Sequence, residues 1–211
     1  MTLETTPLLL QNLYWITLLA VIVSSISGVL KAGFKQFDLF GVVIIAISTG
    51  LGGGSLRDML LDRDVFWIVD EIFFVASIAS AVFIFIAARF IIISPKYFLI
   101  ADAAGLATFA IAGTLVSLML GASPLIASFM GVITGTMGGV FRDVLCNETP
   151  VVFSSPLYAT VSWLGSLAFI GLLMFNVETT YAAAIAGFGI FLVRLIAIYY
   201  KISLPKFRFK G

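Results

Sequence analysis

The chain has 211 residues, of which 61% are hydrophobic and 11% are charged, and its formal net charge at pH 7 is +1. Its mean hydropathy of +1.16 predicts an integral membrane protein. With no histidine and a single cysteine, Cys146, the usual zinc clusters, Ser-His or Cys-His nucleophile pairs and internal disulfides are excluded. We therefore expect no enzyme activity, no cofactor and no resident metal.

Seven apolar runs follow one another along the chain, each of about 18 to 25 residues or a little more, enough to cross about 30 Å of hydrocarbon. They lack the ten-residue alternation of a membrane barrel, so they are predicted to be transmembrane helices in a single all-α membrane domain, residues 1–211. The runs are 13–30, 39–61, 66–93, 98–120, 125–146, 157–175 and 181–200.

The basic residues predict how the chain lies in the membrane. The loops and tail of one side carry nearly all of them, whereas the loops of the other side offer only Arg63. Because cytoplasmic loops are rich in Lys and Arg, we expect the N terminus outside and the C terminus in the cytoplasm of a multi-pass cell (inner) membrane protein, with membrane lipids as neighbours and no nucleic-acid partner. The residues of the basic side are Lys31, Lys35, Arg89, Lys96, Lys201, Lys206, Arg208 and Lys210.

Two glycine-rich motifs interrupt the apolar runs, "GLGGGSLRDML" from Gly50 and "GTMGGVFRDVL" from Gly135. Neither motif is predicted to bind a nucleotide, because Ser55 stands where a dinucleotide fingerprint needs its third glycine and no phosphate-loop GK[ST] follows.

The two motifs belong to an internal repeat with a shift of 85 residues. The shift superposes Gly50 on Gly135 and the Arg-Asp pair at 57–58 on that at 142–143. The copies cover about residues 8–93 and 94–178 and hold three helices each, so the second copy starts from the opposite side of the membrane. This predicts two inverted three-helix repeats, as in many transporters and some channels, followed by a seventh helix and basic tail at about 179–211.

The glycines have two interpretations. Consecutive glycines make a helix easy to unwind or kink, which bares carbonyl oxygens that can bind cations. Alternatively, the Gly-xxx-Gly spacing in each motif lets two helices pack closely. On the first interpretation the candidate pore residues are Gly52, Gly53, Gly54, Gly138 and Gly139, with hydroxyl groups from Ser48, Thr49, Thr134 and Thr136.

Ionisable groups within spans are costly and usually functional. The candidate pore-mouth or gating charges are therefore Arg57, Asp58, Arg142, Asp143 and Asp102. Snorkelling toward the membrane surface is the alternative explanation. Adjacent residues on a helix point about 100° apart, so we expect neither arginine to be neutralised by the aspartate that follows it. The depth-matched partner for Arg142 is Asp102, whose counterpart in the first repeat is Thr17; Asp102 is otherwise a candidate proton carrier.

Acidic residues are predicted to surround the outer mouth, where they outweigh the two arginines Arg57 and Arg63. Such a rim would concentrate cations. Its members are Asp58, Asp62, Asp64, Asp70 and Glu71.

With "DAAGLATFAIAG" opening the fourth helix, the two motifs and the three-plus-three-plus-one plan resemble the prokaryotic branch of the trimeric intracellular cation channel family over nearly the whole chain. The resemblance implies a homotrimer whose protomers each carry a pore, lined by the second and fifth helices kinked at their glycines. It also implies conduction of monovalent cations, with potassium preferred and sodium as the second ion. Met137 stands opposite Gly52, so the two halves need not coordinate ions equally.

Two other classes remain open. Similar sequences have been described as glycine transporters, and a secondary transporter of a small amino acid such as glycine would share the inverted repeat and the broken helices. A purely structural membrane protein would explain the glycines, but not the repeated Arg-Asp pair.

Overall fold

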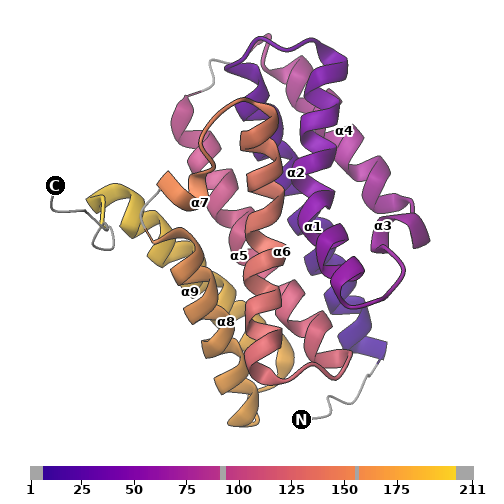
Figure 1. The fold of residues 1–211 in the computed structure, drawn as a ribbon, viewed down its shortest axis with the longest axis vertical. Coiled ribbons are helices and arrows are strands. Elements are labelled where there is room, and N and C mark those ends of the chain that lie inside the picture. The colour runs from indigo at the N-terminus through magenta and orange to yellow at the C-terminus, as the bar shows by residue number, and fades with distance from the viewer. Residues whose placement is uncertain (1–6, 91–93, 155–156, 203–211) are drawn as a thin grey trace, which may run out of the picture.

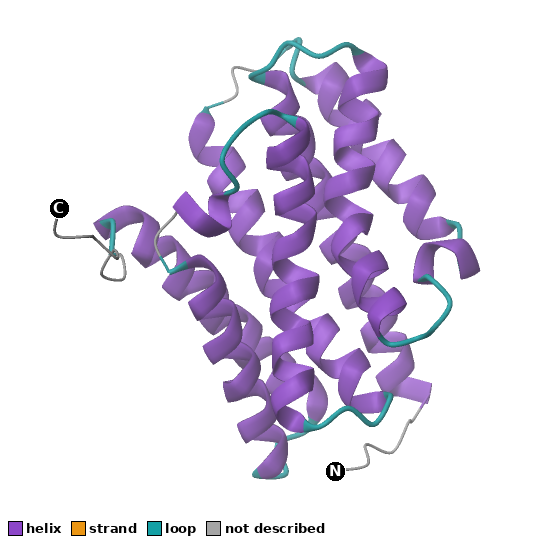
Figure 2. Cartoon of the chain, in the orientation of Figure 1, coloured by secondary structure: helices purple, strands orange, loops and turns teal. Residues whose placement is uncertain are grey.

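Helices make up all of the regular structure in the computed structural model, which describes residues 7–90, 94–154 and 157–202 (Figure 2). Five helices, α1, α2, α5, α6 and α9, are long and apolar enough to cross a membrane, and α4 and α8 are shorter apolar helices. The predicted all-helical membrane fold is thus confirmed. The helices are α1 (Pro7–Gly33), α2 (Leu39–Leu60), α3 (Phe66–Val69), α4 (Ile72–Ala87), α5 (Pro95–Met119), α6 (Pro124–Leu145), α7 (Val151–Ser154), α8 (Tyr158–Met174) and α9 (Thr179–Tyr200).

The third predicted run, residues 66–93, is not one continuous helix. The chain leaves the helical conformation after α3, and Asp70 Oδ1 accepts a hydrogen bond of 3.0 Å from the backbone N–H of Ile72 at the start of α4. The charged pair Asp70-Glu71 therefore divides the run, because its backbone and side chains serve a turn and a helix start. Residues 91–93 lie outside the described part of the chain.

Local backbone features recur at the spacing of 85 residues. The helices α2 and α6 begin at 39 and 124, and the short helices α3 and α7 begin at 66 and 151. Asp38 and Ser123 cap α2 and α6 with side-chain oxygens that accept from Gly41 N and Ile126 N. Two residues earlier, Gln36 and Gly121 adopt positive φ angles of 57° and 81°. The two halves thus share their turns and caps as well as their helices.

The long helices form one bundle (Figure 1). The helices α1, α2, α5 and α6 pack on one another in its centre, with α4 against α1 and α2, and with α8 and α9 beside α6 and α5. Figure 1 shows α6 running through the middle of the view, with α2 on one side and α8 and α9 on the other. The C-terminal end of α6 lies at the top of the view, and the N-terminal end of α1 lies at the bottom.

The helices α2 and α6 touch backbone to backbone at two glycines. A Cβ atom added to Gly53 would lie 2.1 Å from the carbonyl oxygen of Thr134, and one added to Gly138 would lie 2.1 Å from that of Thr49. The two contacts are images of each other under the 85-residue shift. Because no side chain fits at such distances, glycine is required at both positions for this close approach.

The helix α1 packs on α2 in the same way that α5 packs on α6. A Cβ at Gly50 would lie 3.0 Å from the carbonyl oxygen of Val21, and one at Gly135 would lie 2.9 Å from that of Leu106. Both motifs stay α-helical from end to end. The predicted unwinding with bared carbonyls is therefore wrong for this structure, because the glycines give up side chains for close packing while the intrahelical hydrogen bonds are kept.

We predict that Gly53→Ala destabilises the protein by about 2 kcal/mol or more, because its methyl group meets backbone that cannot move aside. Gly139→Ala is the matched control, since its Cβ would lie 3.3 Å from Tyr158 Oη and 3.5 Å from Arg142 Nη2, at the ends of side chains. Thermal unfolding in detergent measures both. Equal melting temperatures for the two variants would contradict the close contact.

Candidate functional site

Two pairs of charged residues lie near the C-terminal ends of α2 and α6. The side chains of Arg57, Asp58, Arg142 and Asp143 are buried, with relative exposures of 2%, 0%, 0% and 0%. A buried charge costs several kcal/mol unless a partner compensates it. Their positions are therefore those of paired internal charges and not of side chains that snorkel to the surface.

Each arginine pairs with the aspartate that follows it. Arg57 Nε lies 2.8 Å from Asp58 Oδ1, and Arg142 Nε lies 2.8 Å from Asp143 Oδ1. A second contact joins Arg57 Nη2 to Asp58 Oδ1 at 2.7 Å. The expectation that neighbours cannot neutralise each other is wrong. The Cβ atoms do point apart, but the long arginine side chain curves around the helix and spans the angle.

The second oxygen of each aspartate holds the start of the following short helix. The backbone N–H of Phe66, at the start of α3, donates to Asp58 Oδ2 at 2.9 Å, and that of Val151, at the start of α7, donates to Asp143 Oδ2 at 2.8 Å. Charge-assisted hydrogen bonds of this kind are stronger than neutral ones. Each Arg-Asp pair thus ties the end of a long helix to the short helix that follows it.

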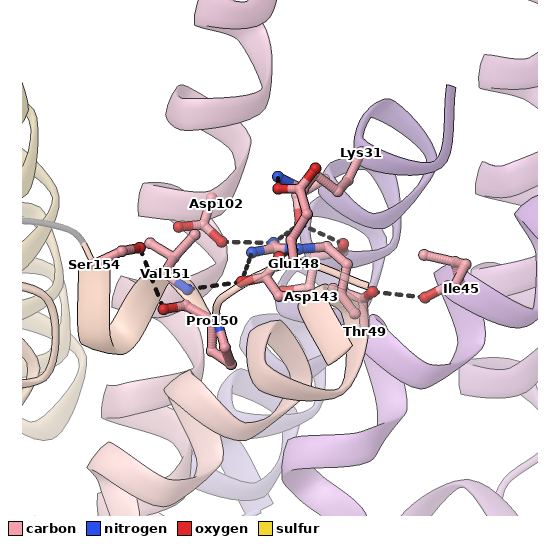
Figure 3. A network of polar contacts seen from close by, with 12 residues as sticks. Lys31, Ile45, Thr49, Asp102, Asp143, Glu148, Pro150, Val151 and Ser154 are labelled. Carbon is pink, nitrogen blue, oxygen red and sulfur yellow. Dashed lines mark hydrogen bonds and ion pairs between the residues drawn. The ribbon is translucent and has the colours of Figure 1, made fainter. Parts of the chain in front are cut away.

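Arg142 also pairs with Asp102, as the sequence predicted. Arg142 Nη1 lies 2.7 Å from Asp102 Oδ1, and Tyr158 Oη donates to the same oxygen at 3.2 Å. Ser27 Oγ accepts a third hydrogen bond from Arg142, at 3.2 Å. Figure 3 shows Asp102 and Asp143 meeting in this network from different helices. The inner cluster, defined as Arg142, Asp143, Asp102, Ser27 and Tyr158, therefore joins α1, α5, α6 and α8.

The equivalent place near Arg57 is built differently. Thr17 stands where the second repeat has Asp102, so α1 supplies no carboxylate there. Instead Arg63 Nε approaches Asp58 Oδ1 at 3.5 Å. One end thus combines two cations with one carboxylate, and the other combines one arginine with two carboxylates.

Sequence analysis missed two members of the inner cluster, Ser27 and Tyr158, and one residue beside it, Arg194. Arg194 on α9 is fully buried, and its guanidinium carbon lies 4.6 Å from the centroid of the Tyr158 ring. A single charge inside an apolar run of 22 residues was a signal for Arg194. Tyr158 gave none, because a tyrosine at the edge of a predicted span is ordinary.

The hydroxyl groups predicted for a pore are mostly satisfied within their own helices. Thr49, Thr134 and Thr136 donate to carbonyl oxygens four residues earlier, at 2.6, 2.7 and 2.8 Å. Such bonds are common for threonine inside membrane helices. The backbone carbonyls of Thr49 and Thr134 face Gly138 and Gly53 across the α2–α6 crossing, whereas Ser48 lies on a half-buried face of α2.

The remaining candidate glycines contact aromatic rings or the inner cluster. A Cβ at Gly52 would lie 2.4 Å from the Phe141 ring, and one at Gly54 would lie 2.6 Å from the Phe66 ring. Gly139 faces Tyr158 and Arg142, as described above. These glycines make room for large side chains around the buried charges.

The predicted acidic rim is wrong for one residue, Asp58. Asp62, Asp64 and Glu71 are exposed and Asp70 is half-buried, but Asp58 is fully buried in its ion pair. Asp58 therefore belongs to the outer charge pair and not to the rim.

A surface ion-pair cluster lies beyond the inner cluster. The carboxylate of Glu148 pairs with Lys31 and, at 2.9 Å, with Lys35 Nζ. Hydrogen bonds from these two lysines lower the pKa of Glu148 below its usual value. The Phe98 ring lies between this cluster and Arg142. Its centroid is 5.2 Å from Lys31 Nζ and 4.7 Å from Arg142 Cζ.

The sequence matches a known family and curated bacterial relatives over most of its length. The sequence model of the family described as "Glycine transporter" matches residues 14–89 and 99–173. The inner membrane protein YadS of Escherichia coli K12 is 37% identical over 197 residues, covering 92% of this chain and 95% of the relative. A membrane protein of Vibrio cholerae is 39% identical over 197 residues, covering 92% and 82%. Both relatives carry the designation UPF0126.

Solved structures also match this chain over most of its length. The trimeric intracellular cation (TRIC) channel orthologue from Rhodobacter sphaeroides matches with a TM-score of 0.85 and 34% identity, over 90% of this chain and 98% of that chain. This chain belongs to the prokaryotic TRIC family. A prokaryotic TRIC channel solved in 0.5 M KCl matches with a TM-score of 0.85 and 30% identity, over 92% and 100%. The predicted resemblance is confirmed, and "Glycine transporter" is an older label for the TRIC family.

The TRIC neighbours also settle two broader expectations. They are channels, and the curated relatives are membrane proteins, so the prediction that this chain is not an enzyme is confirmed. The relative YadS is named an inner membrane protein, in agreement with the predicted membrane location.

For the inner cluster of this TRIC protein, we predict unequal effects of removing each partner. Arg142→Gln leaves two buried carboxylates without their cation and should cost about 3 to 5 kcal/mol. Asp102→Asn leaves Arg142 neutralised by Asp143 and should cost about 1 to 3 kcal/mol. Thermal unfolding of both variants and of the double variant gives a coupling energy. Strictly additive losses would contradict the observed contact.

Proposed function

We propose that this TRIC family member is a monovalent cation channel that prefers potassium to sodium and works as a homotrimer with one pathway in each protomer. The observation that carries the proposal is the match to the Rhodobacter sphaeroides TRIC channel orthologue, which covers 98% of that chain. A match of this extent leaves little of the neighbour without a counterpart here, so the helices that surround a pathway there have equivalents in this chain.

We infer that seven helices cross the membrane: α1, α2, α4, α5, α6, α8 and α9. Three belong to each repeat, and α9 stands outside the duplication. The recurring caps and turns support this arrangement, as do the two matches of the family model, which begin at residues 14 and 99. Because three is an odd number, the repeats are inverted relative to each other.

We propose that the Arg142 end of the bundle faces the cytoplasm. Lys31, Lys35 and Arg89 lie at that end, whereas Arg63 lies at the other. The positive-inside rule then places the N terminus outside and the C terminus inside. The tail residues Lys206, Arg208 and Lys210 lie outside the described part of the chain.

The pathway we propose follows α2 and α6 past their glycine crossing. At this crossing Gly53 and Gly138 bring the two backbones together with no side chains between them, so the proposed pathway is narrowest there. Buried charges flank the crossing toward both ends, which suits a passage for ions. The proposed lining residues are Ser48, Thr49, Gly52, Gly53, Gly54, Thr134, Thr136, Gly138 and Gly139.

Secondary transport of a small amino acid such as glycine is the second candidate. The description of the matching family and the inverted repeat favour it. The proton carrier that it would use is Asp102, but this carboxylate is held by Arg142 and Tyr158. That arrangement favours a structural ion pair over a carboxylate that takes up and releases protons.

Purified protein in planar bilayers with a KCl gradient tests the proposal. We expect unitary current steps that reverse near the potassium equilibrium potential. With potassium on one side of the bilayer and sodium on the other, we expect a reversal potential that indicates potassium preference. Uptake of glycine into proteoliposomes that contain the purified protein is the matched assay. Saturable glycine uptake without current steps would show that the protein is a transporter and not a channel.

We predict that replacing Asp62, Asp64 and Asp70 by asparagine lowers potassium conductance by about twofold at low salt, because an acidic rim concentrates cations. Asparagine at position 70 can still accept the hydrogen bond from Ile72. Near 1 M salt the Debye length falls to about 3 Å and the difference should disappear. An equal loss of conductance at both salt concentrations would show that these carboxylates act on the structure instead.

A further inference from the structure

The two ends of the bundle differ at positions that the 85-residue shift relates, although a cavity of about 350 Å³ between α1, α2 and α4 lies at the Arg142 end as well. At the Arg57 end, a cavity of about 600 Å³ lies between α1, α5 and the segment from α2 to α3. Its lining includes Leu13, Arg63, Val116 and Leu120. Arg63 is exposed, so the cavity reaches the surface at this end.

The equivalent positions at the Arg142 end carry different side chains. Under the 85-residue shift, Leu13 corresponds to Phe98 and Arg63 to Glu148. In the same way, Val116 corresponds to Lys31 and Leu120 to Lys35. These four inner side chains contact one another. Glu148 pairs with both lysines, and Lys31 lies beside the Phe98 ring. Ion pairs thus occupy the place that corresponds to the cavity.

The inner ion pairs continue directly into the buried charges. Phe98 is only 7% exposed, and its ring lies beside both Lys31 and Arg142. Figure 3 shows Lys31 and Glu148 next to Asp102 and Asp143. A cation that moves from the inner cluster toward the cytoplasm therefore meets two ammonium groups behind an aromatic ring. Both the ring and the positive charges oppose its passage.

We propose that Lys31, Lys35 and Glu148 form an ionic clamp that closes the inner end of the cation pathway. The proposal rests on the proposed channel function. It assigns the structure to a state that is closed toward the cytoplasm.

The clamp is attached to a helix that lines the proposed pathway. The backbone N–H of Glu148 donates to the carbonyl oxygen of Asp143 on α6 at 2.9 Å. Lys31 and Lys35 belong to the C-terminal end of α1 and the turn after it. When the end of α6 moves away from α1, Glu148 moves with it and releases the lysines. The clamp therefore opens as α2 and α6 rearrange.

The strength of the clamp suits a contact that breaks and re-forms. The Glu148 side chain is 36% exposed and that of Lys35 is 32% exposed. Ion pairs with this exposure are weak and are screened by salt. The lowered pKa of Glu148 keeps the carboxylate charged at neutral pH.

Single-channel recording of Glu148→Gln in planar bilayers tests the clamp. We expect a rise of about threefold or more in open probability at about 0.1 M KCl, with unitary conductance unchanged, because exposed pairs of this strength correspond to changes of this order. Asp38→Asn is the matched control. It removes one exposed carboxylate on the same side, and asparagine caps α2 equally well, so open probability should stay at the wild-type value.

Charge reversal provides a second test. Lys31→Glu should open the channel as Glu148→Gln does, and adding Glu148→Lys should lower open probability again by re-forming an ion pair. In the wild type, open probability should rise between about 0.1 M and 1 M salt, since salt screens the pairs. If Glu148→Gln fails to assemble, the salt dependence of the wild-type open probability tests the clamp by itself.

The outcomes separate the two proposals. Wild-type current steps together with an unchanged open probability in Glu148→Gln would overturn the clamp and leave the channel intact. An open probability that does not change with salt would also overturn it. A wild type without cation-selective steps would overturn the channel function, and the clamp with it.

Discussion

The arrangement of the bundle depends on two aspartates that cannot stay buried without partners. Asp58 and Asp143 each give one oxygen to the preceding arginine and the other to the backbone of a short helix eight residues later. Satisfying a buried carboxylate in this way fixes the end of a long helix, the turn after it and the next element at once. The interaction occurs twice, at a spacing of 85 residues, so the same arrangement of contacts fixes the geometry of both ends.

The recurrence at a spacing of 85 residues is not exact, and the departures from it involve charged side chains. Asp102 stands where the first copy has Thr17, and Glu148 with two lysines occupies the place that corresponds to the cavity beside Arg63. Both departures lie at the Arg142 end. The crossing of α2 and α6 remains symmetric, because backbone contacts at Gly53 and Gly138 tolerate no side chain in either copy.

The sequence predicted the membrane fold, the repeat and the pairing of Arg142 with Asp102, because hydropathy and spacing carry that information. It did not predict that the glycine motifs stay helical, since consecutive glycines favour unwinding as readily as close packing. The neighbour pairing of Arg57 with Asp58 was missed, because helix geometry gives Cβ directions but not the path of a long side chain. Tyr158 and the clamp emerge only from tertiary contacts between residues more than 50 positions apart.

Arg194 gives α9 a role in electrical asymmetry. Its guanidinium stacks on Tyr158, which holds Asp102, so α9 adds a positive charge to one half of a duplicated structure and has no counterpart in the other. Charges placed unequally along the membrane normal respond unequally to a transmembrane voltage, at about 2.3 kcal/mol per charge for each 100 mV. In the proposed channel, a pathway beside them would therefore pass current more easily in one direction, and rectification would follow from a helix that lies outside the repeated segments.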